Sequence, residues 1–166
     1  DLRQKDTLTI TNGMVNVTLA QNIDNAHNGL PDWWESQHGL SLFAANANSD
    51  LEHDGLSNLL EYAFGGNPTV ADAHQRGVQM EVVTVGDDRF LSLGYYRRVG
   101  DSSLSLRVQE TADLSLWSDL NLSNQTIGVP QNMGDGTEFI HVRGTIPVSG
   151  LNAEHRGFLR IVAERP

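Results

Sequence analysis

Alternating apolar and polar residues near the start of the chain predict a β-hairpin. The runs 7–11 and 14–19 both alternate with period two and flank Asn12-Gly13, a pair that favours a two-residue turn. This turn sets Ile10 opposite Val15 and gathers one apolar face, made of Leu8, Ile10, Val15, Val17 and Leu19. An isolated hairpin is only marginally stable in water, so this face should dock on the chain's own sheet or on a neighbouring molecule. A single strand kinked at Gly13 is the competing interpretation.

The hydrophobic pattern changes twice further along the chain. Between residues 22 and 75, short apolar groups separated by Asp, Asn and Gly predict two short helices, one carrying Trp33 and Trp34 and one over about 57–64. After Arg76 the period returns to two, in the segments 80–85, 90–96, 104–110, 116–120, 139–143 and 158–163. Within 104–110, Leu104, Leu106 and Val108 are expected to form one inward-facing stripe. Short strands separated by Gly, Asp and Ser turns are typical of an antiparallel β-sandwich, here of about seven strands.

The segment 50–61, called loop two below, has oxygen-bearing side chains at the spacing of a calcium loop. They stand at positions 1, 3, 5, 9 and 12, and Gly55 stands at position 6, where the chain must turn sharply. The candidate ligands are the side chains of Asp50, Glu52, Asp54, Asn58 and Glu61 and the backbone carbonyl of Leu56. Ordinary Asp, Asn and Gly turn chemistry is the alternative.

A degenerate copy of this pattern, called loop one below, occupies residues 24–35. Gly29 again stands at position 6, but Ala26 offers no ligand at position 3 and Asn28 replaces a carboxylate at position 5. The candidate ligands are Asp24, Asn28, the carbonyl of Leu30, Asp32 and Glu35. We therefore predict one calcium ion in loop two and a second, weaker calcium site in loop one, for which turn chemistry is again the alternative.

Charge supports a cation site in this part of the chain. Residues 22–75 contain eight acidic residues and no Lys or Arg, within a net charge of −10. Without a cation the carboxylates of loop two would repel one another. The acidic excess argues against nucleic acid as a partner, and no apolar run is long enough to span a membrane. A chain that starts at Asp1, without a signal peptide or cysteines, is expected for a mature exported bacterial protein or a domain cut from one.

Three motifs carry a resemblance to known calcium-binding families. Gly-Leu-Pro-Asp-Trp-Trp-Glu at 29–35, Asp-Gly-Leu-Ser-Asn-Leu-Leu-Glu-Tyr at 54–62 and Gly-Asn-Pro at 66–68 resemble dockerin-like and thrombospondin type 3-like calcium repeats. Followed by a β-rich stretch, they look similar to C-terminal modules of large exported bacterial proteins. The resemblance implies calcium binding and an extracellular or cell-surface location, and it says much less about a partner.

The sequence contains no recognisable catalytic constellation. The six histidines are scattered without a metal-binding pair, and neither a nucleophile elbow nor a phosphate-binding glycine loop occurs. We therefore expect no enzymatic activity. Trp117 and Tyr96 are candidates for stacking on the sugar rings of a polysaccharide, with core packing as the alternative, whereas Tyr95 must face the opposite way from Tyr96.

Together these patterns predict a mainly β protein in three parts. Residues 1–21 form an N-terminal β-hairpin or donor strand, residues 22–75 a calcium-binding loop–helix unit, and residues 76–166 a β-sandwich. The leading hypothesis is a non-enzymatic, calcium-stabilised extracellular subunit that self-associates into filaments by donating its N-terminal β segment to a neighbour. The alternatives are a carbohydrate-binding accessory module of a secreted polysaccharide-degrading enzyme and a cell-surface spacer or sorting domain.

Overall fold

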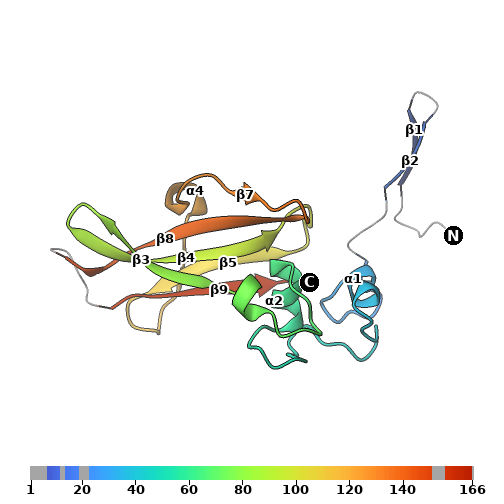
Figure 1. The fold of residues 1–166 in the computed structure, drawn as a ribbon, viewed down its shortest axis with the longest axis horizontal. Coiled ribbons are helices and arrows are strands. Elements are labelled where there is room, and N and C mark those ends of the chain that lie inside the picture. Colours follow the sequence, from blue (N-terminus) through green and yellow to red (C-terminus); the bar gives the residue numbers. More distant parts are fainter. Residues whose placement is uncertain (1–6, 12–13, 19–22, 151–155, 166) are drawn as a thin grey trace.

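The computed structural model describes residues 7–11, 14–18, 23–150 and 156–165 (Figure 1). These residues form a mainly β protein whose strand pairs are antiparallel, as the sequence predicts. The strands are β1 (Thr7–Thr11), β2 (Met14–Thr18), β3 (Gln79–Val85), β4 (Asp88–Arg98), β5 (Ser105–Thr111), β6 (Ser118–Asp119), β7 (Gln131–Asn132), β8 (Thr137–Ser149) and β9 (Phe158–Glu164). The helices are α1 (Asp32–Gln37), α2 (Asn58–Phe64), α3 (Ala73–Arg76) and α4 (Leu122–Gln125).

Strands β1 and β2 form the predicted hairpin. Their register pairs Ile10 with Val15 and Leu8 with Val17, which excludes the single kinked strand. The two strands make a sheet of their own, and Figure 1 shows them apart from the other strands. The predicted apolar residue Leu19 lies outside the described residues.

The two predicted helices are confirmed, and local capping explains where α2 begins and ends. The Ser57 hydroxyl accepts a hydrogen bond from the Leu60 N–H at the start of α2, and Gly65 ends it in the left-handed conformation (φ 74°). The sequence analysis missed α3 and α4 because each has four residues, too few for a helical period to show.

The remaining strands form two sheets, in the orders β3-β4-β8-β7 and β6-β5-β9. Most segments predicted after residue 76 coincide with these strands. Strand β8 extends well beyond the predicted 139–143, β7 was missed, and the predicted strand 116–120 reduces to β6. Leu114 adopts a positive φ (66°) and Leu116 is exposed, so the chain turns there instead of pairing.

One hydrophobic cluster joins helix α2 to both sheets. Leu104 and Leu106 pack against it beside the buried Val108, which confirms the predicted inward stripe of β5. The buried members of the cluster are Leu56, Ala63, Phe64, Leu93, Tyr95, Val108, Leu120, Ile140 and Val142. Full burial of each large apolar side chain stabilises the fold by roughly 1.5–3 kcal/mol. The helix that begins in loop two is therefore held by the same core that holds the sheets.

A second cluster holds the two loop–helix segments together. It consists of Leu30, Trp34, Ala47, Leu59 and Tyr62, so it contains residues of both loop–helix segments. The Tyr62 hydroxyl donates a 2.6 Å hydrogen bond to Asp101, which lies between β4 and β5. This contact ties the loop–helix unit to the sheets a second time.

Strand β3 is an open edge with an apolar side. Among the described strands it pairs with β4 alone, with Met80 opposite Leu93 and Val82 opposite Leu91. Residues directly opposite each other share a face, so Met80 and Val82 share the face of the buried Leu93. They are nevertheless 62% and 45% exposed. Among the described helices, none is long and apolar enough to cross a membrane.

Candidate metal centre

Loop one and loop two share a single pattern of hydrogen bonds. In both loops the aspartate at position 1 accepts from the backbone N–H of the glycine at position 6: Gly29 donates to Asp24 over 2.8 Å and Gly55 to Asp50 over 2.9 Å. Both glycines have a positive φ (85° and 98°), which glycine adopts without steric cost. The two loops are therefore structural repeats.

The resemblance extends to the other backbone groups of the loops. The N–H of position 5 donates to the aspartate of position 1 over 3.2 Å in each loop. The N–H of position 9 donates to the carbonyl just before the loop, from Asp32 to Ile23 and from Asn58 to Ser49. The histidines at position 4, His27 and His53, are exposed and have positive φ values of 53° and 58°. Position 4 is not a ligand position of the loop pattern, so neither histidine is a candidate ligand.

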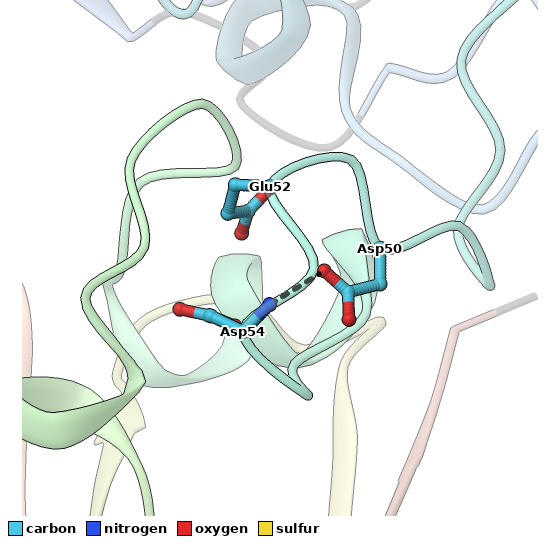
Figure 2. Close-up of side chains that lie close together, drawn as sticks. All are labelled: Asp50, Glu52 and Asp54. Carbon is cyan, nitrogen blue, oxygen red and sulfur yellow. Dashed lines mark hydrogen bonds between the residues drawn. The ribbon is translucent and has the colours of Figure 1, made fainter.

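Loop two gathers its carboxylates around one point. Oxygen atoms of Asp50, Glu52 and Asp54 lie within 4.8 Å of one another, and Figure 2 shows these three side chains along the loop. A second group, made of Asp54, Glu61 and Asp72, meets the same limit. Because Asp54 belongs to both groups, five carboxylates form one continuous cluster.

Several oxygens of this cluster are buried without a hydrogen-bond partner. Glu61 is 0% exposed, and neither of its carboxylate oxygens has a hydrogen-bond partner in the part of the chain that the structure describes. The same holds for both carboxylate oxygens of Glu52, for Oδ1 of Asn58 and for Oδ1 of Asp72. A buried oxygen without a partner is costly, and a buried carboxylate more so, unless a cation or a proton neutralises it.

The pKa values of the buried carboxyl groups in this cluster are raised. Burial, followed by the repulsion of Asp72 and Asp54, raises the pKa of Glu61 from 4.5 to about 8. Burial also raises the pKa of Glu52 and of Asp72. These carboxyl groups therefore accept positive charge readily, and their donor set consists of oxygen alone, the preference of hard divalent cations such as calcium and magnesium.

Loop one satisfies its carboxylates with groups of the protein. The side-chain amide of Asn28 donates to Oε1 of Glu35 over 2.8 Å and to the carbonyl of Leu42 over 3.0 Å. Asn25 donates to Asp32 twice, once from its backbone N–H and once from its side chain. Oε2 of Glu35 remains without a partner, and burial raises the pKa of this group.

An arginine of the protein lies next to the first aspartate of loop one. The side chain of Arg165, at the end of β9, is 1% exposed. Its guanidinium lies 3.8 Å from Asp24 and 3.3 Å from Asp101. Loop one thus has an internal cation beside its position 1, and the corresponding Asp50 of loop two has the carboxylates of its own loop as neighbours.

The structure separates the predicted ligands into two sets. The carboxylates of loop two converge as described. At Leu56, the backbone N–H donates a hydrogen bond to Asp54 and the side chain lies in the core. Among the described residues, the groups of three acidic or histidine side chains that are close enough to share an ion belong to loop two and Asp72, not to loop one. The predicted loop-one ligands are Asp24, Asn28, Leu30, Asp32 and Glu35, and they are instead joined by the hydrogen bonds given above.

Sequence analysis missed Asp72 as a member of the cluster. It lies eleven residues beyond position 12, outside the loop template, and was counted only as part of the acidic segment. Its one signal in the sequence is its position after Gly-Gly-Asn-Pro at 65–68, a turn that sends the chain back toward the loop.

The two candidate sugar-binding residues lie on different sheets. Tyr96 is in β4, with the Phe139 ring at 5.1 Å and the Arg76 guanidinium at 5.0 Å. Trp117 lies just before β6, and the guanidinium of Arg160 covers its ring at 4.0 Å. Tyr95 is fully buried in the core and faces away from Tyr96, as expected. Tyr96 and Trp117 therefore do not form a common platform.

Comparison of the chain with protein-family models, with curated proteins and with solved structures finds no match.

Proposed function

We propose that this chain is a non-enzymatic module whose fold is stabilised by a calcium ion in loop two. The observation that carries the proposal is Glu61, which is fully buried with both carboxylate oxygens unpartnered among four further carboxylates. The residues that would hold the ion are Asp50, Glu52, Asp54, Asn58 and Glu61, with the carbonyl of Leu56. Calcium suits a site with this many oxygens, because it takes six to eight of them in flexible geometry, whereas magnesium demands a strict octahedron.

The location of loop two gives the ion a structural role. Helix α2 begins within the loop, at Asn58, and packs into the core that it shares with the two sheets, which we infer to form the β-sandwich expected from the sequence. A cation that fixes the loop would therefore stabilise one end of that sandwich. Millimolar calcium outside cells would saturate even a weak site, which fits an extracellular or cell-surface location.

We infer further that the module self-assembles through its hairpin and the open edge of β3. A seven-residue edge strand with exposed Met80 and Val82 is a template for strand addition. The hairpin β1–β2 is a separate two-stranded sheet, and such sheets gain stability when a further sheet or apolar surface covers them. The hairpin of a second copy is thus the proposed occupant, and repetition of this head-to-tail contact yields a filament.

The assembly proposal is tested by measuring mass and shape with light scattering and electron microscopy, in calcium and in chelator. Oligomers or filaments are expected, and they should be lost on removal of residues 1–20 and in Val82→Lys, which places a charge on the apolar side of β3. The matched control is Val129→Lys, since Val129 is 85% exposed outside any strand. A wild-type monomer at high concentration would refute assembly and leave the calcium proposal standing.

The carbohydrate-binding alternative is tested by polysaccharide pull-down. Retention on a glycan that Trp117→Ala abolishes would favour an accessory module over an assembly subunit. We expect no retention, because Arg160 already covers a face of the Trp117 ring.

A further inference from the structure

We propose that Asp72, outside the twelve-residue loop, is a ligand of the same ion, so that calcium clamps the segment 66–76 onto loop two. This inference rests on the calcium site proposed above. The new element is the part of the chain that the ion holds in place.

The side chain of Asp72 is positioned as a ligand and not as a helix cap. Asp72 precedes α3 as its N-cap residue, yet its carboxylate makes no capping hydrogen bond. Its Oδ1 is buried and has no partner, and the carboxylate reaches within 4.8 Å of Asp54 and Glu61. Aspartate is a preferred capping residue, and here the carboxylate turns instead to the backbone N–H of Asn67, which leaves Oδ1 available to a ligand.

Loop two and the segment that carries Asp72 are already in contact. Oδ2 of Asp54 accepts a 2.7 Å hydrogen bond from the backbone N–H of Ala73. Fully buried Glu61 supplies two further unpartnered oxygens to the same group. A cation between Asp54, Glu61 and Asp72 would neutralise three carboxylates that otherwise repel one another.

Gly66 keeps the space between Glu61 and Asp72 open. A Cβ atom at Gly66 would lie 1.7 Å from Oε2 of Glu61 and 3.2 Å from Oδ1 of Asp72. Residue 66 does not have a positive φ, so the absent side chain is needed for space and not for backbone conformation. The two loops can be compared at this position. After loop two, the N–H of Gly66 donates to the backbone carbonyl of Glu61, and after loop one the N–H of Leu40 donates to that of Glu35. The glycine thus occurs beside the loop in which both carboxylate oxygens of the position-12 glutamate lack partners among the described residues.

The segment held by Asp72 leads directly to the four-stranded sheet. Helix α3 ends at Arg76, whose guanidinium pairs with Asp135 over 2.8 Å and lies over the ring of Tyr96. Asp135 precedes β8 and Tyr96 belongs to β4. Through Asp72 the ion therefore fixes the chain that enters the sheet, in addition to its own loop.

The test measures calcium binding by isothermal titration calorimetry for wild type, Asp72→Asn and Gly66→Ala. Each variant is expected to raise the Kd at least about tenfold, the range seen when groups that support a metal site are removed. The matched control is Asp87→Asn, an exposed aspartate in the β3–β4 turn, which should leave the Kd unchanged. Asp72→Glu, which keeps the carboxylate, should recover part of the affinity.

Amide hydrogen exchange gives a second, independent readout. In wild type, calcium should slow exchange in residues 67–77 as well as in loop two. In Asp72→Asn at saturating calcium, protection should remain in loop two and be lost in 67–77. Wild-type affinity in Asp72→Asn, or exchange in 67–77 that calcium does not change, would overturn this inference alone. Absence of any calcium binding by wild type would overturn the proposed function with it.

Discussion

Loop one and loop two have the same backbone and different surroundings for their carboxylates. Both aspartates at position 1 accept from the same backbone groups, at distances that agree within 0.1 Å for the position-6 glycines. In loop one, Asn28 donates to the position-12 glutamate and Arg165 lies beside position 1. In loop two the position-12 glutamate has no partner for either oxygen.

The difference shows that the backbone conformation of a loop and the neutralisation of its carboxylates depend on different residues. The aspartate at position 1 and the glycine at position 6 suffice to build the turn. Neutralising the inward carboxylates then needs positive charge or donors, which the protein supplies for loop one and which we propose calcium supplies for loop two. Four experiments test this division.

Removal of the internal cation of loop one should have the largest effect. Arg165→Met leaves Asp24 and Asp101 without the buried guanidinium, and breaking a buried pair costs about 3–5 kcal/mol. The loss of unfolding free energy should be the same in calcium and in chelator, as measured by denaturant unfolding. Arg107→Met, which removes half-exposed surface pairs, should cost no more than about 1 kcal/mol. A loss seen only in chelator would mean that loop one also binds calcium.

Glu61→Gln should weaken calcium binding about 100-fold, which corresponds to about 2.7 kcal/mol. By linkage, the variant should lower the Tm in calcium and change it little in chelator at acidic pH, where Glu61 keeps its proton. Glu35→Gln is the matched control at position 12 of loop one and should leave the calcium affinity as it is, because Asn28 already donates to Glu35. Calorimetry and thermal unfolding measure both quantities. Equal destabilisation of Glu61→Gln in both conditions would remove Glu61 from the ligand set.

In chelator, the stability of the protein should fall as the pH rises. The folded state raises the pKa of Glu61 from 4.5 to about 8, so it holds the proton more tightly than the unfolded state does. This stabilisation is complete below pH 4.5 and is lost as the pH rises through about 8, with a loss of about 2 kcal/mol between pH 5 and pH 7. Urea unfolding at a series of pH values measures the slope. The slope should decrease in Glu61→Gln and in saturating calcium, and an unchanged slope in both would contradict the assignment.

Asn28→Asp should give the smallest effect and is the sharpest test of the division between the loops. It replaces an amide that donates to Glu35 and Leu42 with a carboxylate, at a cost of about 1–2 kcal/mol in chelator. Calcium should recover part of this loss and bind with a stoichiometry closer to two. If the variant is as stable as wild type in chelator, the amide is not what satisfies loop one.

Much of this molecule could be predicted from its sequence, because the signals were local. Asn12-Gly13 defined the hairpin register, and the local pattern over about 57–64 located α2. The alternation of Leu104, Leu106 and Val108 identified the inward face of β5. The spacing of loop two identified the carboxylates that the structure brings together.

What could not be predicted depends on contacts between distant segments. Arg165 reaches loop one from the end of the last strand, and Asp72 joins loop two only because the Gly-Asn-Pro turn returns the chain. Periodicity also carries no signal for two-residue strands such as β7. The donors that Asn28 provides to Glu35 depend on side-chain orientation, which spacing within a loop does not determine.

The distribution of tryptophans has an optical consequence. Trp33 and Trp34 both lie in α1 of the loop–helix unit, where Trp34 packs edge-on against Tyr62, whereas Trp117 lies near β6 under Arg160. Two emission signals therefore come from different parts of one chain. A Trp117→Phe variant would leave only the fluorescence of the loop–helix unit, and Trp33→Phe combined with Trp34→Phe only that of the sheets, so that the order in which the two parts melt can be followed without any added label.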